Sequence, residues 1–395
     1  MSLEYRHDYL LAHIDDLDAG DHRAVSARFP LSFEVHDLEN APAFLIDLIP
    51  QGEARRWLVS RDVPDTDWDL LLHGARNPVG NLRIGEAAVG EAAVGEAAGH
   101  SGVDRAEVIR RGDQFLEWAE QHDIPMVGAS DTLGAAPKLL LTEDGGGLLH
   151  AEGVLPDARA HQHYLVKYPR GKHSTDTLIL SNEAPYLEVL RALGLRCGEP
   201  LSYAEGTLFI PRFDRRRVDG AVERAGLESL YSLLGIVTAG AAVWMEDAAA
   251  ALAEVVDDPH TDLVEFILRD AAAMAMGNTD NHGRNTSIVK PPEGGSALSP
   301  IYDFAPMFLD RDVIKRTLRW RSEPAGEPPD WEDVCSRLEP LLPGGLLRPK
   351  LRDFGERLAV LPQIMAGCGV DAEIIARRQH HIAAASAGLC AVRGA

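Results

Sequence analysis

Apolar residues form short continuous runs between residues 137 and 214, which is typical of buried β-strands. Two such runs, 139–141 and 148–150, flank a polar turn at residues 143–147, so this segment predicts a β-hairpin. Two further runs, 164–167 and 208–210, predict strands, and the second leads into a charged turn at Arg215–Gly220. The first half of the chain is therefore rich in strands.

Beyond residue 227 the apolar spacing changes to that of helices. Residues 227–244 and 263–277 predict long helices, and shorter ones are expected at 331–338 and 371–385. One helix, 103–122, is predicted ahead of the strand-rich part. A strand-rich half followed by a helical half predicts an α+β fold with two lobes, and the cleft between two lobes is the default place for a ligand.

The start of the chain forms a separate pattern. Residues 1–84 mix short helical and extended segments and predict a small α/β subdomain. Residues 85–99 then repeat Val-Gly-Glu-Ala-Ala with a period of five, which fits neither a strand nor a heptad, so we interpret it as a flexible linker, with a frayed helix as the alternative. The predicted domains are 1–101, 102–214 and 215–395.

Composition narrows the classes of function. The 395 residues are 45% hydrophobic and carry a formal net charge of −22, which argues against a groove that binds the nucleic-acid backbone directly. The four cysteines are scattered and lack the spacing of a zinc site or a disulfide framework. No apolar run approaches the length of a membrane span and the first residues do not resemble an export signal, so we expect a cytoplasmic protein.

The candidate chemistry lies in residues 276–289. Asp280 is followed five positions later by Asn285, and residues 286–289 then predict a strand. Protein kinases place an aspartate and an asparagine at this interval, because one orients the substrate hydroxyl and the other binds a metal ion on the phosphates. Asp303 follows the apolar pair Ile301-Tyr302 and could bind the same metal.

Two further features suit a kinase only in combination. Lys167 ends a predicted strand, and Glu183 stands at the expected start of a helix, as the lysine and glutamate of a kinase phosphate site would. Taken separately, such residues are usually solvated. The loop at residues 128–138 could fold over phosphates with its backbone N–H groups, but its glycine spacing matches neither G-x-G-x-x-G nor a Walker loop. By itself a tight structural turn is the better interpretation.

Taken in order, residues 130–138, Lys167, the run Arg212-Phe213-Asp214, the signature at residues 278–285 and Ile301-Tyr302-Asp303 resemble the HipA family of bacterial serine/threonine kinases. The family members are toxins of HipA/HipB toxin–antitoxin pairs. The Asn-x-Asp-x-His-x-x-Asn signature is the most specific part. The resemblance implies a protein-kinase-like fold with a strand-rich N-terminal lobe, an extra N-terminal subdomain and a mostly helical C-terminal lobe.

The resemblance also implies roles for individual residues. Asp280 would be the catalytic aspartate, Asn285 and Asp303 the magnesium ligands, Lys167 the phosphate-binding lysine held by Glu183, and His282 a structural member of the loop. The backbone around Pro211 and Phe213 would hold adenine. The phosphate loop would include Ser130, Asp131, Thr132, Leu133, Gly134 and Lys138.

The implied activity is ATP- and Mg²⁺-dependent phosphorylation of a protein of the translation machinery, such as an aminoacyl-tRNA synthetase. The implied partner is a small helix-turn-helix antitoxin. Two alternatives stay open: a kinase for a small molecule or lipid headgroup, and a nucleotide-binding pseudokinase that regulates a DNA-binding partner.

Two regulatory features are left open by the residues. The family often phosphorylates its own loop serine, but Asp131 occupies that position here, so either the aspartate imitates the phosphate charge or Ser130 or Thr132 accepts the phosphate. A basic cluster follows Asp303 and could dock an acidic substrate or, as an exposed helix face, neutralise nearby acids; it comprises Arg311, Lys315, Arg316, Arg319 and Arg321. Arg284 is expected to be solvated.

Overall fold

The computed structural model describes residues 1–16, 23–75, 78–85, 102–111, 115, 118–119, 137–324 and 327–394. The chain forms two compact units, each of which is discontinuous in sequence. Unit 1 comprises Met1–His173, Glu199–Val237 and Val289–Gly295, and unit 2 comprises Ser174–Gly198, Thr238–Ile288 and Ser296–Ala395. The predicted linker, apart from Gly85, and the predicted phosphate loop, apart from its last two residues, lie outside the described residues.

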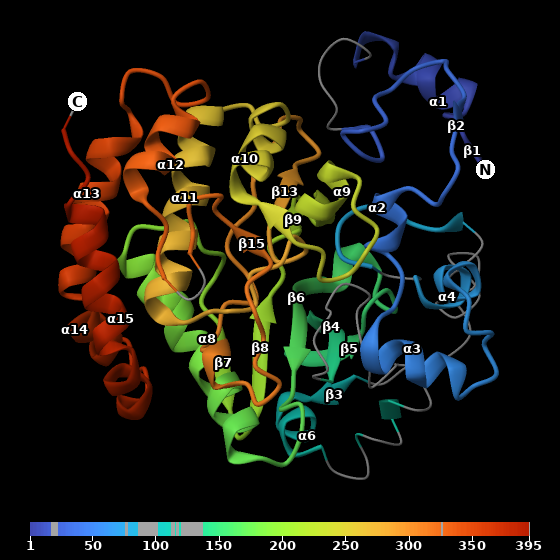
Figure 1. Ribbon diagram of the computed structural model, residues 1–395. Coiled ribbons are helices and arrows are strands. Elements are labelled where there is room, and N and C mark those ends of the chain that lie inside the picture. Colours follow the sequence, from blue (N-terminus) through green and yellow to red (C-terminus); the bar gives the residue numbers. More distant parts are fainter. Residues whose placement is uncertain are drawn as a thin grey trace. The chain divides into compact units, whose positions relative to one another are not determined.

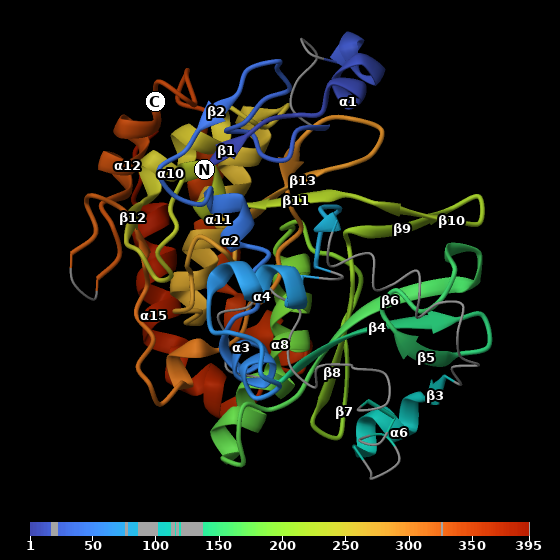
Figure 2. The same ribbon diagram turned by 90° about the vertical axis from the view of Figure 1, so that its right-hand side faces the viewer.

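A six-stranded sheet forms the centre of unit 1 (Figure 2). Its strands pair in the order β3-β5-β4-β6-β8-β7, and every pairing is antiparallel. The strands are β3 (Val103–Asp104), β4 (Lys138–Asp144), β5 (Leu148–Ala151), β6 (Ala160–Lys167), β7 (Ser202–Ala204) and β8 (Thr207–Pro211). The predicted hairpin and the two predicted strands are confirmed.

One face of the sheet is covered by apolar side chains from before β4. Val108 of helix α6 (Arg105–Arg110) packs with Phe115, Trp118, Leu139 and Phe209 in a single cluster. The predicted helix over 103–122 is wrong in its extent, because β3 occupies its start and Arg111 takes a left-handed conformation, with φ of 51°, that ends α6.

The N-terminal part of unit 1 is built of short elements with two small apolar cores. They are β1 (Ser2–Leu3), α1 (His7–Ala12), η1 (Ile14–Asp16), β2 (His36–Asp37), α2 (Ala43–Ile46), α3 (Gly52–Val59) and α4 (Asp67–Gly74). Leu48, Leu58 and Leu70 share one core, and Leu10, with a few neighbours, forms the other.

After β8 the chain forms a second hairpin. Strands β9 (Arg215–Val218) and β10 (Ala221–Arg224) are antiparallel and turn at Asp219 and Gly220, so the predicted charged turn is mostly strand. The predicted helix over 227–244 is also wrong, since this segment contains β11 (Gly226–Ser229), α9 (Leu230–Leu234) and β12 (Val243–Trp244). The left-handed conformation of Gly235, with φ of 71°, ends α9 after five residues.

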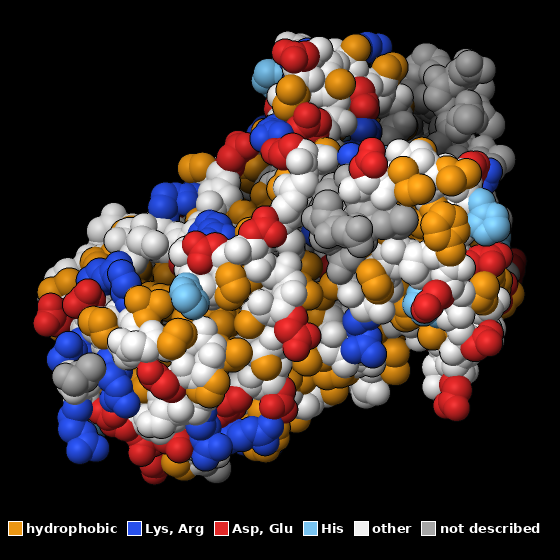
Figure 3. All heavy atoms as spheres, turned by 90° about the horizontal axis from the view of Figure 1, so that it is seen from above, with side chains coloured by type: hydrophobic (Ala, Val, Ile, Leu, Met, Phe, Trp, Pro, Cys, Tyr) orange, Lys and Arg blue, Asp and Glu red, His pale blue; other side chains and the backbone are white. Residues whose placement is uncertain are grey.

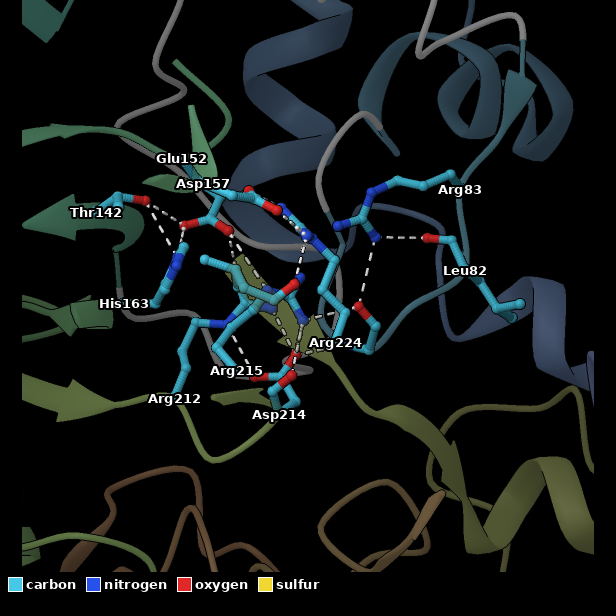
Figure 4. Close-up of polar contacts among 12 residues, drawn as sticks. Leu82, Arg83, Thr142, Glu152, Asp157, His163, Arg212, Asp214, Arg215 and Arg224 are labelled. Carbon is cyan, nitrogen blue, oxygen red and sulfur yellow. Dashed lines mark hydrogen bonds and ion pairs between the residues drawn. The ribbon is translucent and has the colours of Figure 1, made fainter. Parts of the chain in front are cut away.

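A buried charge network begins directly after β8 (Figure 4). The carboxylate of Asp214 accepts two hydrogen bonds from Arg212, at 3.0 and 2.6 Å, and one from Arg215, at 2.8 Å. The backbone N–H of Gly80 also donates to Asp214, at 2.7 Å, and Arg215 donates back to the carbonyl oxygen of Gly80. Asp214 therefore ties the end of the sheet to the N-terminal part of unit 1.

Glu152 supplies a second carboxylate to this network. It lies 2.9 Å from Nδ1 of His163 and 3.3 Å from Nη1 of Arg212. Burial opposes its ionisation, but Arg212 and His163 together hold the pKa of Glu152 far below its usual range. Burial raises the pKa of Asp214, but the charge and hydrogen bonds of Arg212 lower it, and the net pKa is below its usual range. Both carboxylates are therefore charged inside the folded protein at neutral pH.

Unit 2 is mostly helical, and α11 (Pro259–Met276), α13 (Leu347–Ala359) and α15 (Ala372–Cys390) pack together (Figure 1). Asp258 caps the start of α11 through the N–H of Thr261, at 3.1 Å. The predicted helices at 263–277, 331–338 and 371–385 are confirmed. The remaining elements are α8 (Ser174–Ala192), α10 (Met245–Ala253), β14 (Ala297–Leu298), η4 (Met307–Leu309), β15 (Leu318–Arg319), α12 (Trp331–Leu338) and α14 (Leu361–Gly367), together with β13 (Ser287–Lys290), which begins in unit 2.

Helix α11 ends at Gly277, whose φ of 82° lies in the left-handed region. The N–H groups of Gly277 and Asn278 both donate to the carbonyl oxygen of Ala273, at 2.8 and 3.0 Å. A Cβ atom at Gly277 would lie 2.6 Å from a ring carbon of Phe308 and 3.0 Å from Nε of Arg378. Both the backbone conformation and the available space therefore require glycine.

The surface carries both signs of charge. On the face shown in Figure 3, acidic and basic side chains are intermixed with apolar ones. In the part of the chain that the structure describes, no helix combines the length and the apolar character needed to cross a lipid bilayer.

We expect Asp214→Asn to lower the free energy of unfolding by about 3–5 kcal/mol, because it removes one of the two carboxylates that balance two buried guanidinium groups. Denaturant titration would measure the loss. The matched control is Asp157→Asn. Its partner Arg224 is 2.7 Å away, but 40% of the Asp157 side chain is exposed. Solvent screening should keep the loss below about 1 kcal/mol. Equal losses in the two variants would contradict the role given to the network.

The same network should make the protein sensitive to acid. The folded-state pKa values of Glu152 and Asp214 lie below the ordinary values of 4.5 and 3.8, so their contribution to stability is complete above these values. It is lost as the pH falls through the folded-state pKa values. The free energy of unfolding of the wild type should therefore decline below pH 4.5, and this decline should be smaller in Asp214→Asn.

Gly277→Ala should lower the free energy of unfolding by more than about 1 kcal/mol, because it combines left-handed strain with steric overlap. Gly240→Ala separates the two causes, since Gly240 has a φ of 69° and no atom within 4 Å of its Cβ position. Thermal unfolding of both variants would measure the difference. If the two variants lose the same stability, the space at Gly277 has no importance.

Candidate active site

Residues 278–286 form the loop that connects α11 to β13, and three predicted site residues lie in it. Nδ2 of Asn285 donates a hydrogen bond to the carbonyl oxygen of Asp280, at 2.8 Å. The backbone N–H of Asn285 donates to the carbonyl oxygen of His282, at 2.9 Å, and Nε2 of His282 is 3.5 Å from Oδ1 of Asp280. The structure thus brings Asp280, His282 and Asn285 together.

The hydrogen bond to Asp280 also orients the amide of Asn285. Because Nδ2 is used as a donor within the loop, the other branch of the amide presents its oxygen, Oδ1, away from that bond. Amide and carboxylate oxygens are the protein ligands that Mg²⁺ prefers. The loop geometry therefore suits a metal-binding role for Asn285.

Tyr302 ties the segment that contains Asp303 to this loop. Its hydroxyl donates to the carbonyl oxygen of Arg284, at 2.6 Å, and lies 2.6 Å from Oγ of Ser287. Asp303 follows directly, with a φ of 53°, a left-handed conformation that is strained for any residue with a side chain. The side chain of Arg284 is buried, with 6% exposed, so the expectation that it is solvated is wrong.

The oxygen ligands present fit a magnesium ion that shares its shell with a substrate. Among the described residues, no group of three or more His, Cys, Asp or Glu side chains is arranged to hold a metal ion. A metal at Asn285 and Asp303 would need further ligands from phosphate or water. Mg²⁺ is usually held in this way in phosphoryl-transfer enzymes, by one or two carboxylates and the substrate phosphates.

The last turn of α11 is held by two buried side chains. The hydroxyl of Tyr186 donates to the carbonyl oxygen of Met276, at 3.0 Å. Arg378 donates to the carbonyl oxygens of Ala275 and Met274, at 3.0 and 2.6 Å. Burial lowers the pKa of Arg378 to about 10, so it stays charged at neutral pH and suits the negative end of the helix dipole.

The basic cluster after Asp303 is largely neutralised within unit 2. Arg316 pairs with Asp270 at 2.9 Å, Arg319 with Glu323 at 3.3 Å, and Arg321 with Asp247 at 2.6 Å. These contacts favour the interpretation that the cluster balances nearby acids. Its segment is irregular apart from β15, so the expected helix face is wrong.

In unit 1, Lys138 and Lys167 occupy opposed positions of β4 and β6. Opposed residues of an antiparallel pair share one face, and these two lysines are buried, with 2% and 4% exposed. Pro211 ends β8 opposite Tyr164, and Phe213 lies half-buried in the turn that follows.

The remaining candidates lie elsewhere. Glu183 is buried on α8, which begins at Ser174, so its expected place at a helix start is wrong and it lies in the middle of the helix, two residues before Pro185. The candidates thus divide between the units, with Asp280, His282, Asn285, Asp303 and Glu183 in unit 2 and Lys138, Lys167, Pro211 and Phe213 in unit 1. Ser130, Asp131, Thr132, Leu133 and Gly134 lie outside the described residues.

Three residues that support the loop were not predicted from the sequence, namely Tyr186, Arg378 and Asp270. Asp270 left a signal, because it is the only charged residue in the last seven of α11, which are otherwise alanine and methionine. An acid within such an apolar helical segment indicates a buried partner. Arg378 and Tyr186 left none, since each binds backbone atoms about 90 residues or more away in the sequence.

Residues 130–357 match the family model of the HipA-like C-terminal domain. A curated protein described as putative kinase Y4mE, from Sinorhizobium fredii (strain NBRC 101917 / NGR234), is 29% identical over 166 residues. The aligned region covers 40% of this chain and 38% of that protein, so the similarity spans well under half of the relative.

Two solved structures are similar to this one. The HipA structure from Shewanella oneidensis MR-1, in a complex with HipB and its operator DNA, aligns with a TM-score of 0.63 and 19% identity over 87% of this chain and 84% of that chain. The Helicobacter pylori proinflammatory kinase CtkA aligns with a TM-score of 0.40 and 14% identity over 59% of this chain and 90% of that chain. The likeness to the Shewanella structure confirms the kinase-like α+β fold.

The family match covers more than half of the chain, and it includes the whole loop at residues 278–286 and Asp303. The resemblance read from the sequence motifs is therefore confirmed, and the chain belongs to the family of the HipA-like C-terminal domain.

Proposed function

We propose that this protein is an ATP- and Mg²⁺-dependent serine/threonine protein kinase and the toxin of a HipA/HipB-type toxin–antitoxin pair. One observation carries the proposal. The hydrogen bond from Asn285 to the carbonyl oxygen of Asp280 holds a carboxylate-bearing residue and an oriented amide in one loop. Phosphoryl transfer needs this pair of groups to position the acceptor hydroxyl and the metal. Membership of the HipA-like family supports the same reaction.

The residues of unit 2 would act on the acceptor and the metal. Asp280 would orient the serine or threonine hydroxyl and accept its proton. Asn285 and Asp303 would hold Mg²⁺, which when bound neutralises charge on the β- and γ-phosphates. His282 is buried, and its Nε2 lies 3.5 Å from Oδ1 of Asp280. It would fix the loop rather than transfer protons.

The residues of unit 1 would bind the nucleotide. Lys167 and Lys138 are opposed on one sheet face and would bind phosphate oxygens through charge-assisted hydrogen bonds. On the family resemblance, Glu183 would serve as the glutamate of the phosphate site, and the backbone near Pro211 and Phe213 would hold adenine. The phosphate loop would comprise Ser130, Asp131, Thr132, Leu133 and Gly134.

The proposed partner is a small helix-turn-helix antitoxin. The similar Shewanella HipA structure contains HipB and operator DNA, which supports this assignment. The net charge of −22 favours contact with DNA through the antitoxin rather than through this chain. On the family resemblance, we assign the substrate to the translation machinery, with an aminoacyl-tRNA synthetase as the first candidate, and the location to the cytoplasm.

We expect Asp280→Asn to reduce phosphate transfer by at least about 100-fold, since it removes the proton acceptor while keeping the shape of the side chain. Transfer from labelled ATP to substrate would measure the loss, and the unfolding temperature should not change. Asp353→Asn is the matched control, because Asp353 is an exposed acid on α13. Near-normal transfer by Asp280→Asn would remove Asp280 from the catalytic role.

Incubation of the protein with labelled ATP and a bacterial lysate should place label on one protein. This result separates the proposed function from two others. Label in a small molecule or lipid would indicate a different acceptor class, and ATP binding without transfer would indicate a regulatory pseudokinase. Lys167→Met should abolish the labelling, because it removes a phosphate-binding charge.

A further inference from the structure

A buried carboxylate lies on α11 close to the start of the catalytic loop. Asp270 has 6% of its surface exposed. It accepts hydrogen bonds from Nδ2 of Asn281 at 3.2 Å, from Nη2 of Arg316 at 2.9 Å and from Nε1 of Trp320 at 2.8 Å. One carboxylate therefore joins the loop to a segment about 40 residues further along the chain.

Asn281 is the member of the loop that this carboxylate holds. It follows Asp280 directly, and its Nδ2 also donates to the carbonyl oxygen of Leu318, at 3.0 Å. The N–H of Leu318 donates back to the carbonyl oxygen of Asn281, at 3.2 Å. The backbone on the C-terminal side of Asp280 is thus fixed by three hydrogen bonds to two elements, α11 and β15.

Arg316 connects Asp270 with Leu318. Its guanidinium binds both oxygens of Asp270, at 2.9 and 3.1 Å, and it also donates to the carbonyl oxygen of Leu318, at 3.3 Å. Nε of Arg316 lies 3.5 Å from Glu323. Asp270 thus acts on Asn281 both directly and through the carbonyl group that Arg316 and Asn281 share.

A purely structural ion pair is the alternative, and energetics argue against it. A buried ion pair is commonly no more stabilising than a well-packed apolar pair of similar volume, because both charges lose their hydration. A buried ion pair instead fixes the positions of the residues around it, since its hydrogen-bond partners can occupy only one arrangement. Here the partners are a residue next to Asp280 and a segment that binds that same residue.

We propose that Asp270 is a positioning residue for phosphoryl transfer, which holds Asn281 and thereby sets the backbone that carries Asp280. This inference rests on the proposed function. Asp270 does not contact the acceptor hydroxyl or the phosphate and acts only through Asn281 and Arg316.

The same helix offers a matched comparison. Asp262 is also a buried acid of α11 and pairs with Arg196 at 2.7 Å and with the N–H of Leu298 at 2.9 Å. Both of these partners, Arg196 and Leu298, lie outside the loop at residues 278–286. Asp270→Asn and Asp262→Asn therefore remove the same charge from the same helix, and only the first should affect the loop.

Steady-state kinetics of the full-length protein would test the inference. Asp270→Asn should lower kcat by at least about 10-fold, because small misplacements of a catalytic group are costly, while KM for ATP changes by less than about two-fold. Asp262→Asn should keep kcat within about two-fold of the wild type. In the Asp280→Asn background, Asp270→Asn should cause no further loss, since both changes remove the action of one group.

Hydrogen–deuterium exchange supplies a readout that does not require activity. The amides of residues 278–286 should exchange faster in Asp270→Asn than in the wild type, and at the wild-type rate in Asp262→Asn. Equal kcat losses in the two variants, or unchanged exchange in Asp270→Asn, would overturn the inference. A wild type that transfers no phosphate would instead refute the proposed function, and the exchange rates would still decide whether Asp270 holds the loop.

A second variant covers the case in which Asp270→Asn does not fold. Asn281→Ala cuts the same link from its other end, at a half-buried loop position. It should lower kcat by a similar factor without changing KM for ATP. A wild-type kcat in a folded Asn281→Ala protein would overturn the inference.

Discussion

The loop at residues 278–286 depends on one constraint, which is that the buried last turn of α11 must find donors for its carbonyl groups. A helix end leaves its last carbonyl oxygens without partners in the helix, and here they are shielded from water. Arg378 of α15 and Tyr186 of α8 supply the missing donors. The helices on either side of the loop in sequence therefore meet where the loop begins. Gly277 then allows the chain to leave the helix within a single residue. These contacts fix the N-terminal end of the loop, before Asp280.

The buried charge network of unit 1 follows the same physical logic. Its carboxylates, Glu152 and Asp214, are ionised because guanidinium groups surround them, and each guanidinium is also bound to more than one segment of the chain. The net stabilisation by such charges is small compared with the cost of removing one of them. Their main effect is to allow a single arrangement of the chain after β8, where Phe213 lies between Arg212 and Asp214. In both units, then, buried charges specify the geometry next to candidate site residues.

Local patterns in the sequence were sufficient for the strands of unit 1, for α11, α12 and α15, and for the loop that contains Asp280 and Asn285. They failed where a local helix start or stop was missed and where the partners of a residue lie far away in the sequence. Residues 227–244 have enough apolar residues for a helix, but Gly235 ends α9 early. Glu183 was placed at a helix start because residues 174–176, the first of α8, are polar and lack the apolar spacing of a helix. The role of the basic cluster could not be read from the sequence, since the acids that neutralise Arg316 and Arg321 include Asp270 and Asp247, which precede them by more than 40 residues.

Contacts on both sides of Asp303 restrict its strained backbone. Asp270 of α11 binds Arg316 and Trp320, which follow Asp303 in the chain. Tyr302, which precedes Asp303 directly, is held through the carbonyl oxygen of Arg284. A left-handed aspartate persists only when its surroundings leave the backbone no alternative, and these contacts provide that restriction. The same helix leads directly into the loop with Asp280 and Asn285. Helix α11 therefore helps to position all three proposed catalytic and metal-binding residues of unit 2.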